Sequence, residues 1–348
     1  MIPFMPTLYE GELAYSWFAR YHVHSGSMTY SMTAEALFGK KTAIPSTEFF
    51  PPLSKNLVQC IERTMSLREF AEKHTLLPYS VRFVPLERRK EAMNALVHMD
   101  RSYTDFLYLR GEKTYWKKYM RYCPLCAAED RERYGETFWH REHQLAEVDI
   151  CTIHRCRLEN SSVESVCNLQ RFQLIPAEIV APYGKTANFS VTETEWQVAA
   201  MAITVLKENM DLERDVPIGD FLHFKLAGTS YLSPRGENVY ARRLYEDMAI
   251  FYRELPKCSL HAWWQVQKIF CGQNFHAFDI CLVASFRNIP VEQLLFPELP
   301  EKPIHVQFDE RLWELRQQGM TQRQVAETLG LSIHIIKETE EKMKKRLA

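Results

Sequence analysis

The stretch YCPLCAAEDRERYGETFWHREHQLAEVDICTIHRC, residues 122–156, contains two short patterns that are typical of metal ligands. The first is the pair Cys123 and Cys126, and the second is the pair Cys151 and His154. In each pair the side chains stand three residues apart, so one tight turn can present both to the same tetrahedral ion. Two such turns separated by 24 residues fit a structural zinc site. Because four protein ligands leave no position for a reactive water, we predict one Zn²⁺ that holds structure and does not catalyse.

Three alternatives stay open for this stretch. Cys156 lies close enough in sequence to replace His154 as the fourth ligand. An open, catalytic zinc site would need His140 and His143, but HREH is not the H-E-x-x-H pattern of metalloproteases. The plainest alternative is a set of unligated core residues. A second group of cysteines and histidines lacks a matched second pair, and we expect it to pack in a helical core. This group is Cys258, His261, Cys271 and His276.

The composition indicates a globular protein of two or three domains. The 348 residues are 46% hydrophobic, which is enough for a large core. The start MIPFMPTLYEGEL has no basic segment before an apolar run, and no apolar run approaches the length of about 18 residues that spans a membrane. We therefore expect a cytoplasmic, nucleoid-associated protein without a membrane partner. The net charge of −1 excludes a broadly cationic surface, but it leaves room for a local DNA-binding face.

The rest of the sequence predicts helices. In ELAYSWFARYHVHSG the apolar residues recur every three or four positions, and SMTAEALFG has a cap candidate in Thr33 and a stop at Gly39. Two further amphipathic segments are SLREFAEKHTLLPYS and LERRKEAMNALVHM. The predicted fold is mainly α and multidomain, with helix-turn-helix-like modules and one small zinc finger. The predicted segments are a helical module over 1–120, the zinc finger over 121–160, a helical middle domain over 161–300 and a helix-turn-helix over 301–348.

The carboxyl-terminal sequence DERLWELRQQGMTQRQVAETLGLSIHIIKETEEKMKKRL follows the helix-turn-helix pattern. Leu312, Trp313 and Leu315 mark the apolar face of a first helix, Thr321 caps the second, and Gly330 makes the turn to the third. In such motifs the start of the third helix meets base edges, and the start of the second meets phosphates. The predicted base contacts are Ser332, His334 and Lys337, and the predicted phosphate contacts are Thr321 and Gln322.

A second DNA contact is predicted in the basic stretch that ends at Tyr122. Residues 86–122 carry nine Lys or Arg and five acidic residues. The candidates there are Lys113, Lys117, Lys118 and Arg121. The alternatives are a solvated helix face for this stretch and a helix-turn-helix that serves only for packing.

Three motifs in the first 160 residues resemble the TniQ/TnsD family of transposon target selectors. The zinc stretch is similar to the family's C-P-x-C, R-Y-G-x-x-F-W-x-R and C-x-x-H series. LYEGELAYSWFARYHVHSG resembles its opening segment, and EKHTLLPYSVRFVPLERRKEA resembles its H-T-x-x-P segment. Three motifs in the right order are more specific than the zinc spacing alone.

The resemblance implies a function in Tn7-like transposition. The chain would bind double-stranded attachment-site DNA and recruit an AAA+ ATPase regulator, which brings in the transposase. The resemblance also implies that Tyr15, Trp17 and Arg20 contact this ATPase. It further implies that the chain is not an enzyme, and the sequence contains no phosphate-binding glycine loop and no nucleophile elbow. The alternatives are an adaptor that couples a CRISPR effector complex to the same ATPase and a zinc-finger/helix-turn-helix transcription regulator.

Overall fold

The computed structural model describes residues 2, 4–99, 118–165, 173–255, 258–272 and 275–347. It is mainly helical, as predicted, with a few short strands around the cysteines. Contacts divide the chain into two compact units: Met1–Asp215, Tyr252–Ser259 and Asn274–Leu295 form unit 1, and Val216–Phe251, Leu260–Gln273 and Phe296–Ala348 form unit 2. In the described part of the chain, every helix is too short or too polar to cross a membrane. The four predicted segment boundaries stay predictions.

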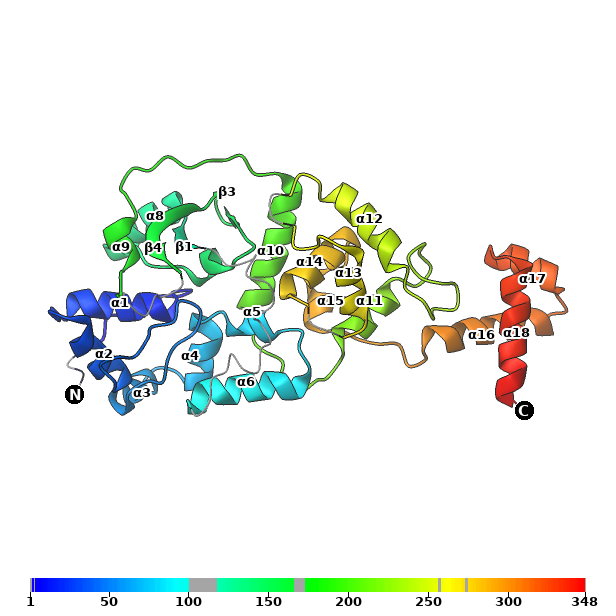
Figure 1. Cartoon of the computed structure of the whole chain (residues 1–348), viewed down its shortest axis with the longest axis horizontal. Helices are drawn as coiled ribbons and strands as arrows, with labels where there is room; N and C mark the ends of the chain where they lie inside the picture. The colour runs from blue at the N-terminus through cyan, green and yellow to red at the C-terminus, as the bar shows by residue number, and fades with distance from the viewer. Residues whose placement is uncertain are drawn as a thin grey trace. The chain divides into compact units, whose positions relative to one another are not determined.

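The amino-terminal part of unit 1 is a group of short helices (Figure 1). They are α1 (Ala14–His24), α2 (Tyr30–Phe38), α3 (Lys55–Ile61), α4 (Leu67–His74), α5 (Leu77–Val81) and α6 (Leu86–His98). Ser54 and Ser66 cap α3 and α4 through their side chains, and Gly39 ends α2 with φ of 67°. The predicted cap Thr33 is wrong: α2 begins one turn earlier, after Thr29. An aromatic core that includes Trp17, Phe18 and Phe70 joins α1 and α4.

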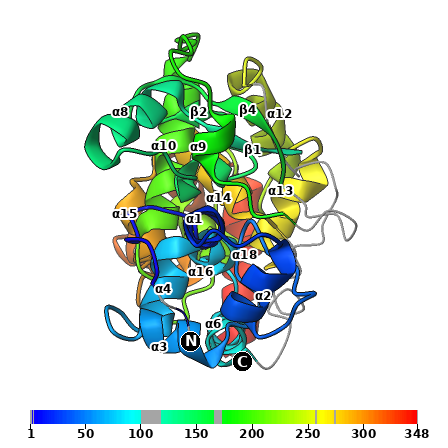
Figure 2. The same ribbon diagram turned by 90° about the vertical axis from the view of Figure 1, so that its left-hand side faces the viewer.

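The cysteine-rich stretch forms a small finger in the same unit. Its elements are β1 (Tyr119–Tyr122), α8 (Pro124–Tyr134), the 3₁₀ helix η2 (Arg141–Gln144), β2 (Ile150–Cys151), β3 (Cys156–Arg157) and β4 (Glu159–Glu164). Strand β1 pairs with β4, and β2 pairs with β3, both antiparallel. Figures 1 and 2 both show α8 and these strands gathered together. The remaining helices of unit 1 are α9 (Ala177–Val180), α10 (Glu193–Lys207), α14 (Ala277–Phe286) and α15 (Val291–Leu295), with α10 packed on α5 and α14.

Unit 2 contains α11 (Ile218–Lys225), α12 (Ala241–Phe251), α13 (Trp263–Phe270), α16 (Ile304–Gln317), α17 (Gln322–Leu329) and α18 (Ile333–Leu347). The last three helices share a core of buried apolar residues, namely Leu312, Leu315, Val325, Ala326 and Ile336. Gly330, with φ of 66°, makes the turn between α17 and α18, as the sequence predicted. Trp313 does not belong to this core, because its side chain is 53% exposed.

Candidate metal centre

The four predicted ligands meet at one point. Their ligand atoms, three Sγ and one imidazole nitrogen, lie within 4.8 Å of one another. Nδ1 of His154 is 3.5 Å from Cys123 Sγ, 3.3 Å from Cys126 Sγ and 3.6 Å from Cys151 Sγ. A tetrahedral zinc with bonds of about 2.3 Å to sulfur and about 2.0 Å to nitrogen requires ligand separations of about 3.5–3.8 Å. The residues therefore fit one metal ion of this size, and zinc stays the prediction for its identity.

Local structure places these ligands without side-chain rearrangement. Cys123 follows β1 and is the N-cap of α8, and its Sγ accepts the N–H of Cys126 at 3.5 Å. Pro124, the first residue of α8, has no N–H that would need a partner. Cys151 ends β2. In the turn that follows, the N–H of His154 donates to Cys151 Sγ at 3.5 Å. We call each pair of ligands with its turn a knuckle: Cys123–Cys126 is the first and Cys151–His154 is the second. The two knuckles thus share one local geometry.

A carboxylate fixes the ring of the fourth ligand. Nε2 of His154 lies 2.9 Å from Glu129 Oε1 on α8, so Nδ1 is left to face the sulfurs. Carboxylate partners of this kind orient metal-binding histidines. Burial disfavours the charged imidazole, but hydrogen bonds to Glu129 and Cys151 outweigh it and raise the pKa of His154 to about 9 before a metal binds. A bound cation would replace the proton on Nδ1.

The structure also places the alternative ligands. Cys156 Sγ lies 3.4 Å from Cys123 Sγ, and burial raises the pKa of this thiol. The group that gathers as metal ligands contains His154 and not Cys156. Nε2 of His140 lies 2.8 Å from the Asp130 carboxylate, and neither histidine of HREH belongs to the group of gathered ligands, so the two do not form an open catalytic site. Within the described ranges, the Cys123 group is the one set of three or more metal-ligating side chains, and the second sequence group does not assemble.

The finger is joined to the helical module through Trp139, which is fully buried. Its indole N–H donates to Ile175 O at 2.9 Å, and its backbone N–H donates to Ser16 Oγ at 2.9 Å. The N–H of Leu13 in turn donates to Trp139 O at 2.9 Å. The finger and α1 therefore form one hydrogen-bonded body, and the metal can hold both in place.

We call the hydrogen-bonded contact between Trp139 and α1 the joint. The sequence analysis did not predict a network of buried charges that lies beside it. Glu12 is fully buried, accepts from Ser16 at 2.8 Å and pairs with Arg20 at 2.9 Å, while Arg20 also pairs with Glu136 at 2.9 Å. Burial raises the pKa of Glu12 to about 7 despite the nearby guanidinium. His74 is buried as well, and its Nδ1 lies 2.7 Å from Glu12 O. A partner 116 residues away, as Glu136 is for Arg20, leaves no local signal in the sequence.

The three residues expected to contact the ATPase are core residues. Tyr15, Trp17 and Arg20 are 1%, 5% and 1% exposed. The Trp17 indole donates to Pro6 O at 2.7 Å, and the Tyr15 hydroxyl donates to Gln173 O at 3.3 Å. An interface anchor must reach the surface. Their burial therefore corrects the prediction that these side chains bind a partner.

The predicted DNA contacts of the basic stretch divide into three cases. Lys113 and Lys117 lie outside the described residues. Arg121 is 2% exposed, and its guanidinium pairs with Asp149 and donates to Leu145 O. This burial removes Arg121 from the candidates for phosphate contact. Lys118 is exposed at the start of the finger and stays a candidate.

The carboxyl-terminal candidates keep most of their predicted placement. Ser332, His334 and Lys337 are exposed at the start of α18. Thr321 caps α17 and forms a capping box with Gln324. Gln322 departs from the expectation, because its amide donates to Glu340 Oε2 on α18 at 2.6 Å and so braces the two helices.

Comparison with known proteins bears directly on the module that contains the metal ligands. Residues 3–158 match the TniQ family model. This part of the chain is a TniQ domain. Over 152 residues the chain is also 27% identical to the transposition protein TnsD of transposon Tn7 from Escherichia coli, covering 43% of this chain and 30% of that protein. The sequence resemblance to the TniQ/TnsD family is thus confirmed, and the TniQ domain comprises the amino-terminal helices together with the finger.

Proposed function

We propose that this chain is a non-enzymatic target selector of a Tn7-like transposon, which binds attachment-site DNA and recruits an AAA+ ATPase regulator. The observation that carries the proposal is the TniQ domain over residues 3–158, which contains one metal-sized Cys₃His cluster. The 27% identity to TnsD of Tn7 over 152 residues supports it. The match covers 30% of that relative's length.

DNA reading is proposed for the three-helix segment α16–α18. Its core is closed by its own apolar residues, so the start of α18 is free to present Ser332, His334 and Lys337. A helix of this kind enters the major groove and contacts base edges with its first turns. Thr321 opens α17, whose free backbone N–H groups would face phosphate.

The contact with the ATPase is proposed for the TniQ domain as a whole. Since Tyr15, Trp17 and Arg20 are buried, the contact surface must use other residues of this domain. The three core residues would support that surface through the joint between α1 and the finger. Substitutions there would act through folding.

A second candidate is the adaptor that couples a CRISPR effector complex to the same ATPase. The acidic content of α18 favours it, because Glu338 and Glu341 are exposed next to Lys337. Negative side chains beside a phosphate backbone weaken DNA binding. In this function, base pairing of a guide RNA would read the sequence in place of α18.

One experiment separates the two candidates. Purified wild-type protein is titrated with a labelled duplex from the insertion locus and with a scrambled duplex, without guide RNA. A target selector retains the locus duplex preferentially, and His334→Ala/Lys337→Ala removes the preference while Lys302→Ala, an exposed lysine outside α18, keeps it. Equal binding of both duplexes by the wild type would contradict direct DNA selection.

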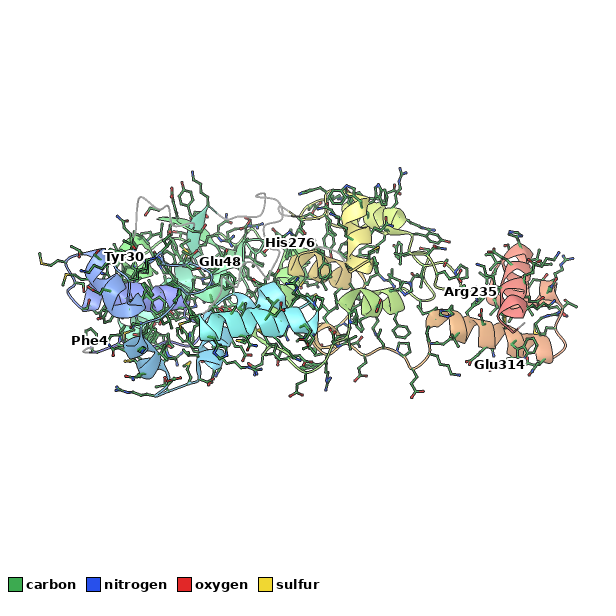
Figure 3. All side chains as sticks on the ribbon, turned by 60° about the horizontal axis from the view of Figure 1, so that its bottom comes forward. Phe4, Tyr30, Glu48, Arg235, His276 and Glu314 are labelled. Atoms are coloured by element: carbon green, nitrogen blue, oxygen red, sulfur yellow. The ribbon has the colours of Figure 1, made fainter. Side chains whose placement is uncertain are left out.

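A truncation is a poorer test than these substitutions. Arg235, labelled in Figure 3, is 5% exposed, and its guanidinium pairs with Asp309 of α16 at 2.9 and 2.7 Å. Removing residues 309–348 would leave this buried charge without its main partner. Loss of binding by the truncated chain would then report misfolding as well as a missing DNA contact.

A further inference from the structure

The three sulfurs of the metal cluster receive their N–H donors from different sources. Cys123 Sγ and Cys151 Sγ each accept a backbone N–H from their own knuckle, both at 3.5 Å. Cys126 Sγ instead faces Nε2 of His143 at 3.8 Å, and the same ring also interacts with Cys151. His143 belongs to η2, outside both knuckles, and is 2% exposed.

The surroundings of His143 indicate where its proton lies. Nδ1 is buried and has no hydrogen-bond partner among the described residues, whereas Nε2 faces a sulfur. A buried N–H without an acceptor is costly, and orphaned N–H groups are rarer than unsatisfied acceptors. The neutral ring therefore carries its proton on Nε2, which donates to Cys126.

The net charge of the loaded metal centre explains why an N–H donor is needed beside a sulfur. Three thiolates, a neutral imidazole and a divalent cation sum to −1, and the sulfurs of the cluster are at most 3% exposed. An N–H···S bond withdraws negative charge from one thiolate and holds it in position. We propose that His143 is a positioning residue of the metal centre, supplying the third N–H···S bond and so slowing loss of the ion. This proposal does not depend on target selection.

The bond can be tested through the electronic spectrum of the metal. In protein loaded with Co²⁺, His143→Phe keeps ring volume but removes the donor, so the sulfur-to-cobalt charge-transfer band should move to lower energy. Zinc release to a chelator should become faster, in line with the loss of about 10–100-fold in metal affinity that removal of an outer-shell partner typically causes. His143→Gln retains an N–H and should recover part of both changes. His140→Phe is the control, because the His140 ring lies next to that of His143, with centroids 4.8 Å apart, but hydrogen-bonds to Asp130.

A measurement on the wild type keeps the proposal testable where a variant fails to fold. The spectrum of ¹⁵N-histidine-labelled, Cd²⁺-loaded protein should show His143 protonated at Nε2 and bare at Nδ1. A proton on Nδ1 would overturn the proposal, as would a wild-type band position and release rate in His143→Phe. A purely structural contribution of the ring would leave the band of His143→Phe unshifted.

Discussion

Glu12 and Arg20 form the charge pair on which the joint between α1 and the finger depends. Replacing Arg20 with alanine removes the guanidinium from a fully buried carboxylate, a change that typically costs about 3–5 kcal/mol. The folded-state pKa of Glu12 is raised to about 7, above its unfolded value, so its folded state holds a proton that it loses as pH rises. We therefore expect Arg20→Ala to be more destabilising at pH 8 than at pH 6.

Urea unfolding followed by tryptophan fluorescence at the two pH values measures this effect. The control is Arg68→Ala, because Arg68 is about half exposed and pairs with Glu72 at 3.3 Å across one helical turn. That pair should contribute less than about 0.5 kcal/mol. Equal losses for the two variants would show that Glu12 does not depend on Arg20.

His74 predicts a pH dependence of the opposite sign. Burial lowers its pKa to about 4, from about 6.5 in the unfolded chain, so the unfolded state binds more protons between these values. Stability should fall as pH drops through this window, by up to about 2 kcal/mol between pH 7 and pH 5. His74→Gln keeps an N–H for Glu12 O but does not titrate. The difference between wild-type and variant unfolding free energies should therefore change with pH, and a constant difference would contradict this role.

At the scale of elements, the metal knuckles were predictable because each is local. Two ligands three residues apart on one turn fix their own geometry, so spacing alone found the four residues. The sequence did not show that Arg121 is buried, because its partner Asp149 is 28 residues away in sequence. It also placed Trp313 on the apolar helix face, but Trp313 shares a helical turn with two core leucines and still faces solvent. Helix periodicity defines an apolar face only to within about one residue position. Burial of a charge depends on partners brought by the fold.

Removal of one knuckle ligand should unfold more than the finger. Cys123 is both a metal ligand and the N-cap of α8, and the finger shares backbone hydrogen bonds with α1. Structural zinc couples roughly 10 kcal/mol or more of binding to folding. We expect purified wild type to contain one zinc and Cys123→Ser to lose it together with near-ultraviolet circular dichroism of the TniQ domain. The exposed Cys271→Ser is the control for the same chemical change; a metal-free wild type would refute the assignment.

At the scale of the whole molecule, charge limits how DNA can be bound. The chain has 43 basic and 44 acidic residues, and one of the predicted phosphate contacts, Arg121, is committed to Asp149. Binding that neutralises Z phosphates varies with salt with a slope of about −0.9Z. A chain whose basic and acidic residues nearly balance should therefore show a shallow slope and gain its preference from base contacts. The family motifs identified the TniQ domain, but the sequence did not show that Arg121 is buried.

The exposed Lys118 and Lys337 should then affect DNA binding in different ways. Lys118 lies next to the finger with its ammonium 5.1 Å from the Tyr119 ring centre, and its exposure keeps it a candidate for a phosphate contact. Lys118→Ala should weaken locus and scrambled duplexes equally and reduce the salt slope by about 1. Lys337→Ala should weaken the locus duplex selectively, by about 1–3 kcal/mol, because a base contact is lost. Fluorescence anisotropy over a series of salt concentrations measures both, with Lys302→Ala as the control. An even loss on both duplexes for Lys337→Ala would mean that α18 meets the backbone and does not read sequence.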